Sequence, residues 1–257
     1  MENVFMDPEA KSSEFQVPYD IVDLPSQGLL YTNKQKTVTV EYLTALDETI
    51  LTSPNILNND RVTDVLISRK VKNLGFNSDE LLEGDRTAIL LFLRVTGFGP
   101  DYAQMVFDLK SSSMVEGNID LSTLKQKKLT INPDSDGLFD YELPDSKKRI
   151  KFRFLTGKDE KEIEERDAAD MERSGDGISK KIIYKLEKQI SSIDGITDKI
   201  KISNIIKNLT ILESRKLRKY INDIEPGIDF KVSARTPGGG SVDTFLRFNT
   251  SFFWPEL

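Results

Sequence analysis

The side chains that carry most protein chemistry are unevenly represented in this chain of 257 residues. It contains 42 aspartates and glutamates and 36 lysines and arginines, but no histidine and no cysteine. Disulfides and the usual zinc sites are therefore excluded, and so are most nucleophile–base pairs, because serine and threonine nucleophiles usually need a histidine. Carboxylate and lysine chemistry stays open. We expect no catalytic, cofactor-binding or metal-binding residue, and a protein that works by holding other proteins.

One acidic run has the residue type that a cation needs, because magnesium and calcium prefer carboxylate oxygens. Its members are Asp159, Glu160, Glu162, Glu164, Glu165 and Asp167. No ligand loop with a fixing glycine accompanies them, and helical spacing would spread them around an axis. We interpret the run as a solvated helix face. A hydrolase that uses Asp or Glu is a further class, and it would need paired carboxylates in a cleft.

Basic side chains follow in the next helices and could form a phosphate-binding stripe. They are Lys180, Lys181, Lys185, Lys188, Lys199, Lys201, Lys207, Arg215, Lys216, Arg218 and Lys219. Three observations argue against nucleic-acid binding. Only Tyr184 and Tyr220 lie among these residues for base stacking, the acidic run could neutralise the stripe, and the net charge of the chain is −6. A nucleic-acid-binding regulator that uses residues 180–219 is therefore the alternative function. The loop 236–240 lacks a phosphate-loop signature and is predicted to be a hairpin tip.

The hydrophobic periodicity predicts the elements that position these residues. The alternation in residues 37–42 indicates a strand, and Thr32 to Lys34 suits a hairpin tip. Helices are expected at residues 45–51, 60–73 and 78–95, the last as the buried centre of a lobe. A β-hairpin is indicated by the alternation in residues 139–143 and 150–154. A charged helical region with a solvated first helix is predicted for residues 157–225. A strand, a glycine turn and a second strand are predicted for residues 228–257.

These elements predict an α+β fold. Residues 1–16 form a polar N-terminal arm, 17–100 an N-terminal β-hairpin and helical lobe, 101–156 a β-rich ribbon-like segment, 157–227 a charged helical segment, and 228–257 a C-terminal β-hairpin with an aromatic tail. No signal peptide is visible, and the longest apolar run, residues 88–95, is too short to cross a bilayer. We expect an intracellular protein with no membrane contact and no small-molecule substrate.

Two features of the chain invite a binding role. Phe252, Phe253 and Trp254 cluster near the C-terminus, where they either fold back into the core or anchor a partner. The stretches 105–121 and 230–248 both read as strand, small-residue turn, strand, which is the shape of a zinc ribbon without its cysteines. The second feature suggests that packing replaces a metal.

The order of several short strings resembles a T4-like bacteriophage baseplate protein family. The strings are LPSQGLLY (24–31), VEYLTALDE (40–48), TSPN (52–55), LLEGDRTAIL (81–90), RVTG (94–97), FLTGKDE (154–160), PGID (226–229) and SFFWP (251–255). The similarity covers most of the chain from about residue 18. Relatives often carry cysteines in the ribbon-like segments, so their zinc does not transfer to this chain, and the family supplies no catalytic residues.

This resemblance implies a baseplate hub subunit or hub-assembly factor of a contractile-tailed phage. Its partners would be other baseplate or hub proteins, in the cytoplasm of the infected bacterium or in the tail baseplate of the virion. The residues predicted to contact a partner are Leu24, Leu29, Leu30, Tyr31, Phe252, Phe253 and Trp254.

Overall fold

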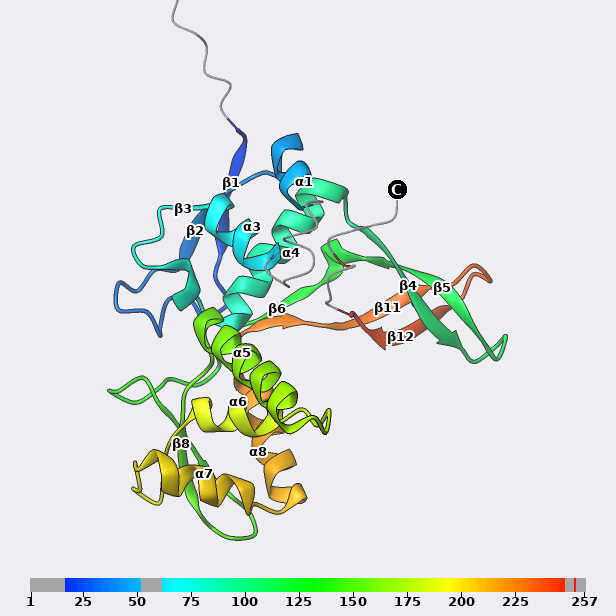
Figure 1. Ribbon diagram of the computed structural model, residues 1–257. Helices are drawn as coiled ribbons and strands as arrows, with labels where there is room; N and C mark the ends of the chain where they lie inside the picture. Colours follow the sequence, from blue (N-terminus) through cyan, green and yellow to red (C-terminus); the bar gives the residue numbers. More distant parts are fainter. Residues whose placement is uncertain (1–16, 52–61, 248–251, 253–257) are drawn as a thin grey trace, which may run out of the picture.

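The computed structural model describes residues 17–51, 62–247 and 252. It confirms the α+β class, because helices and several antiparallel sheets alternate along the chain. Figure 1 shows an upper lobe built from the N-terminal part, a lower helical region, and a four-stranded arm that projects to one side. Most buried apolar side chains, from Val22 to Phe252, belong to one continuous core.

The upper lobe combines a small sheet with helices. Its elements are β1 (Tyr19–Asp23), β2 (Thr37–Glu41), α1 (Ala45–Leu51), α3 (Val62–Lys70), β3 (Val71–Lys72), the 3₁₀ helix η1 (Ser78–Glu80) and α4 (Glu83–Phe98). β2 pairs with both β1 and β3, and its alternation buries Val38 and Val40. α4 is the buried centre, as predicted, since Ile89 and Leu93 lie in the core.

Two helix boundaries differ from the sequence prediction. The helix predicted at 60–73 ends at Lys70, where the chain enters β3 and pairs with β2. The helix predicted at 78–95 is split: η1 ends at Glu80, and α4 begins only at Glu83. Leu82, the N-cap of α4, makes no side-chain cap bond, so tertiary contacts rather than a capping residue place this helix start.

The arm is one sheet made of two hairpins that are distant in sequence. β4 (Asp101–Asp108) and β5 (Ser113–Asp120) form the first hairpin, and β11 (Lys231–Arg235) and β12 (Ser241–Phe245) form the second. β5 pairs with β11 through Arg235 and Asn118, which gives the order β12-β11-β5-β4. The two ribbon-like stretches of the sequence thus lie side by side.

The lower region surrounds a second sheet with helices. It contains β7 (Phe139–Glu142), β8 (Arg149–Phe152), α5 (Gly157–Ser174), α6 (Lys181–Gln189), β9 (Ile190–Ile193), α7 (Lys199–Lys207) and α8 (Ile211–Ile224). The predicted hairpin of β7 and β8 is present, and β9 adds to β8. Ile190 was predicted on a helix face but begins this strand.

A short two-stranded sheet connects the parts of the molecule. η2 (Leu121–Thr123) leads to β6 (Lys125–Lys127), which pairs with β10 (Gly227–Asp229) next to α4. Strands from the predicted segments 101–156, 157–227 and 228–257 therefore share sheets with one another. No helix in the described part of the chain has the length and apolar character needed to cross a membrane.

Candidate protein-binding surface

The outer face of the β4–β5 hairpin carries a strip of large apolar side chains. The two-residue period of β4 turns Tyr102, Gln104 and Val106 inward, which leaves Met105 and Phe107 outside. The side chain of Phe107 is 50% exposed, that of Met114 is 50% exposed, and that of Leu109 at the tip is 82% exposed. We call Met105, Phe107, Leu109 and Met114 the arm strip.

The strand register makes the arm strip continuous. Phe107 is paired directly with Met114 across the hairpin, and Met105 is paired with Glu116. Side chains opposite each other on one face of an antiparallel pair have Cβ atoms about 5 Å apart, so the Phe107 and Met114 side chains are neighbours. Contiguous apolar surface of this kind is typical of protein-binding sites.

The inner side of the arm is held together by specific contacts. Gln104 Nε2 donates to the carbonyl oxygen of Phe245 at 3.1 Å, and its Oε1 accepts from the backbone of Arg247 at 2.8 Å. Gly117 permits a close approach, because a Cβ there would lie 2.9 Å from both Ala234 Cβ and Val106 Cγ2. These contacts join the two hairpins into one platform that presents the arm strip.

The tips of the two hairpins lie together at the end of the arm. A Cβ built on Gly240 would lie 3.5 Å from Lys110 Nζ. The side chain of Lys110, in the turn after β4, therefore lies against the turn after β11. Asp108 shapes the first turn, and the backbone hydrogen bond from Lys110 lowers the pKa of this carboxyl. Apart from Leu109, small and polar residues form both turns, in the places where a metal ribbon would carry its knuckles.

The predicted contact segment 24–31 lies mostly inside the chain. Leu24 and Tyr31 are buried, Leu30 is half-buried, and Leu29 is at the surface. Tyr31 Oη donates to Asp85 Oδ2 at 2.6 Å and accepts from the backbone of Leu82 at 2.9 Å. Leu24 and Tyr31 therefore join this segment to the start of α4, and in this folded state they are not available to a partner.

A buried carboxylate is the centre of this junction. Asp85 is fully buried and accepts hydrogen bonds from the backbone and hydroxyl of Ser26 as well as from Tyr31. Burial raises the pKa of Asp85, although these hydrogen bonds act in the opposite direction. All three donors to Asp85 belong to the protein itself, so we assign this carboxylate a structural role.

Phe252 is the residue of the aromatic end that the structure describes. Phe252 is 0% exposed and packs on the ring of Tyr102, with the ring centroids 5.2 Å apart. Its carbonyl oxygen accepts from Arg94 Nε at 2.8 Å. Phe252 thus folds back into the core, which leaves its side chain unavailable to a partner here, whereas Phe253 and Trp254 lie outside the described residues.

Arg94 is a residue whose role the sequence did not predict. Its guanidinium is buried and donates to the backbone carbonyl oxygens of Gly99, Asp101 and Phe252. Burial lowers the pKa of Arg94. The sequence signal for this role is that Arg94 interrupts the longest apolar run. A charged group buried in such a run costs free energy unless it is hydrogen-bonded.

The acidic and basic runs pair with each other across α5 and α6. Lys181 Nζ lies 3.3 Å from Glu164 Oε1, Lys185 Nζ lies 2.7 Å from Glu160 Oε1, and Lys188 contacts Glu162. α5 is not the wholly solvated helix predicted, since Ile163, Asp159 and Asp167 are buried. The positive charge of α6 is largely compensated by this neighbour, as the sequence allowed.

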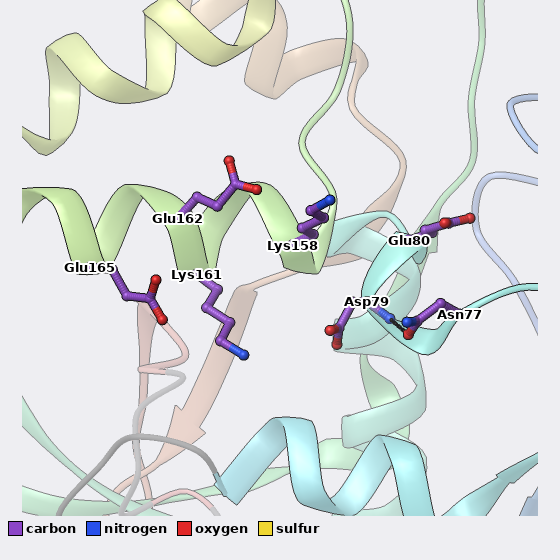
Figure 2. Close-up of a pocket in the computed structure, with 7 residues that line it drawn as sticks. All are labelled: Asn77, Asp79, Glu80, Lys158, Lys161, Glu162 and Glu165. Carbon is purple, nitrogen blue, oxygen red and sulfur yellow. Dashed lines mark hydrogen bonds between the residues drawn. The ribbon is translucent and has the colours of Figure 1, made fainter.

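A polar hollow separates η1 from α5. Figure 2 shows its lining, which consists of Asn77, Asp79, Glu80, Lys158, Lys161, Glu162 and Glu165, around a volume of about 320 Å³. Lys158 and Lys161 lie near Glu162 and Glu165 on α5, so opposite charges are mixed around the opening. Among the described residues no group of carboxylates could hold a metal ion. The hollow offers neither a nucleophile with its base nor a cation site.

Comparisons with models of protein families, with curated proteins and with solved structures find no match for this chain.

Proposed function

We propose that this chain is a non-enzymatic protein-binding component whose main contact surface is the arm strip. More specifically, we propose a baseplate hub subunit or hub-assembly factor of a contractile-tailed bacteriophage. The observation that carries the first statement is the exposed apolar face of the β4–β5 hairpin. The second statement rests on the family resemblance of the sequence, and the partner it implies is another tail protein.

The composition of the arm strip supports a protein partner. Interface centres are enriched in aromatic residues and methionine, and the arm strip contains Phe107, Met105 and Met114. Methionine side chains adapt to irregular apolar surfaces at little cost. A projecting hairpin also reaches a partner without rearrangement of the lobe behind it (Figure 1). The compensated charges of α6 argue against the nucleic-acid alternative.

The test is a double substitution, Phe107→Ser with Met114→Ser. Each side chain is half exposed, so we expect the variant to keep its circular dichroism spectrum and melting temperature. Binding of the tail-protein partner should weaken by at least about thirtyfold, which corresponds to the loss of about 2 kcal/mol from an interface hot spot. Partners are identified by mass spectrometry after co-purification from infected cells, and affinity is then measured with the purified pair.

A matched control removes exposed apolar surface elsewhere. Ile211→Ser with Leu212→Ser changes two exposed side chains at the start of α8, which lies in the lower helical region and not in the arm (Figure 1). This control should bind the partner with unchanged affinity. Equal affinities of the arm variant and the parent protein would refute the proposed role of the arm strip.

A further inference from the structure

The lower helical region contains a second, chemically different depression. It lies among α5, α6, β9 and α7 and has a volume of about 580 Å³. Its wall carries five cationic side chains, from Arg153, Arg166, Lys188, Lys199 and Lys207, and a single carboxylate, from Glu187. Three of these cations are paired with carboxylates: Arg153 with Asp159, Arg166 with Glu187 and Lys188 with Glu162. The uncompensated positive charge of the depression therefore lies on α7.

The cations on two sides of the depression are held in place by carboxylates. Arg153 makes two hydrogen bonds to Asp159, at 2.6 and 2.8 Å, and Arg166 donates to Glu187 at 2.7 Å. These hydrogen bonds raise the pKa of Arg153 and hold its guanidinium in one orientation. The arginines are therefore fixed in position, and these carboxylates balance their charge.

The two lysines on α7 are differently placed. Lys199 and Lys207 are exposed, and among the described residues neither forms an ion pair; Lys199 Nζ has only a long contact, 3.4 Å, to the carbonyl oxygen of Ile190. Helical spacing puts Lys199, Ser203 and Lys207 on one face of α7, next to the face that buries Ile202 and Ile206. These two ammonium groups are therefore free to bind an incoming anion.

We propose that this depression binds an acidic polypeptide segment of a partner protein, in extended conformation, with carboxylates at positions i and i+4. Lys199 and Lys207 are eight residues apart on α7, which is about 12 Å along the helix axis. Residues i and i+4 of an extended strand are about 13 Å apart and point to the same side. The spacing of the two lysine positions along α7 thus matches the spacing of two carboxylate-bearing positions in such a segment.

The surroundings favour a peptide over a nucleic acid. Ile200 is 74% exposed at the rim, where it offers apolar contact to a side chain at position i+2. Tyr184 is buried and its ring is covered by the guanidinium of Arg166 at 3.8 Å, so it is not available to stack on a base.

The experiment uses the full chain and a fluorescein-labelled peptide with the repeat Glu-Ser-Leu-Ser-Glu, followed by fluorescence anisotropy. Lys199→Gln with Lys207→Gln should weaken peptide binding several-fold to about tenfold, since two partly exposed ion pairs are lost. The control Lys201→Gln with Lys231→Gln removes two other exposed lysines and should bind as the parent does. The arm variant should also bind the peptide normally, which separates this proposal from the proposed function.

Three outcomes would overturn the inference. The first is the absence of measurable binding by the parent protein, and the second is equal loss of binding in the two lysine variants. The third is tighter binding of a single-stranded oligonucleotide or of inorganic phosphate than of the peptide, which would mark the depression as a phosphate site. A peptide with glutamine in place of each glutamate should not bind.

Discussion

At the scale of single residues, two acidic side chains, one buried and one partly buried, affect the stability of the fold. Asp85 joins the turn at Ser26 to the hydroxyl group of Tyr31 through hydrogen bonds. A buried carboxylate of this kind persists only when hydrogen bonds replace its water, and three donors do so here. The second acid, Glu225, follows α8 and lies close to Glu83, the first residue of α4.

Substitution of Tyr31 by phenylalanine tests the Asp85 junction. The change removes one donor to Asp85 and the acceptor for the backbone N–H of Leu82, so two buried polar groups lose a partner. We expect the free energy of unfolding, measured with urea, to fall by about 1–3 kcal/mol. Tyr19→Phe alters a hydroxyl on an exposed ring and should leave stability unchanged. Similar stability for both variants would contradict the structural role of the junction.

Glu225 makes stability depend on pH. Burial, followed by the negative charge of Glu83, raises the pKa of Glu225 from 4.5 to about 7. The folded state therefore holds the proton more tightly than the unfolded state, so this group's contribution to stability is fully present below about pH 4.5 and is lost as the pH rises to about 7. Glu225→Gln should therefore raise the free energy of unfolding, relative to that of the parent protein, by more at about pH 8 than at about pH 5.

The measurement for Glu225 is a pair of urea titrations at the two pH values. Glu165→Gln, at an exposed position on α5, is the control and should shift stability equally at both. A Glu225→Gln variant whose stability difference from the parent is the same at both pH values would show that this carboxyl has no raised pKa.

At the scale of elements, helix starts depend on what lies against them. α5 begins at a capping box, in which Thr156 Oγ1 accepts from the backbone of Asp159 and the Asp159 side chain accepts from the backbone of Thr156. α4 has no such cap. Instead, Gly84 in its first turn lies directly against the backbone before β10. The absence of a side chain at Gly84 allows the upper lobe and β10 to meet.

Two glycine substitutions within α4 distinguish this close contact from helix propensity. A Cβ at Gly84 would lie 1.8 Å from the carbonyl oxygen of Pro226, so Gly84→Ala requires a backbone shift. A Cβ at Gly97 would lie 2.8 Å from Leu43 Cδ1, the end of a flexible side chain. We expect Gly84→Ala to lower the unfolding free energy by about 1–3 kcal/mol or more, and Gly97→Ala to change it by less than about 1 kcal/mol. Equal effects would mean that the contact with Pro226 is loose.

At the scale of the whole molecule, the two candidate binding sites lie on different parts of the fold. The arm strip belongs to the four-stranded sheet, and the cationic depression belongs to the lower helical region (Figure 1). One is apolar and the other is charged, so salt should weaken the second contact far more than the first. A protein with two such surfaces can hold two partners, or two parts of one partner, in a defined relation.

Local patterns in the sequence predicted the elements well. The alternation at residues 37–41, the hairpin of β7 and β8, and the exact bounds of α1 follow from short-range periodicity, capping and proline placement. The exclusion of thiol and imidazole chemistry also needs only the sequence. The arm strip was visible in part, because Met105 and Phe107 alternate with inward residues, but no signal distinguished its outer face from its inner one.

Contacts between distant parts of the chain decided the rest. The pairing of β5 with β11 joins residues more than a hundred positions apart and makes one sheet of the two hairpins. The same kind of long-range contact buries Phe252 on Tyr102 and Tyr31 on Asp85, where the sequence alone left both burial and partner contact open. An aromatic side chain is stabilised by any apolar surface that removes it from water, so its residue type cannot specify which surface that is. Only the tertiary structure assigns those side chains to the core and leaves the arm strip exposed.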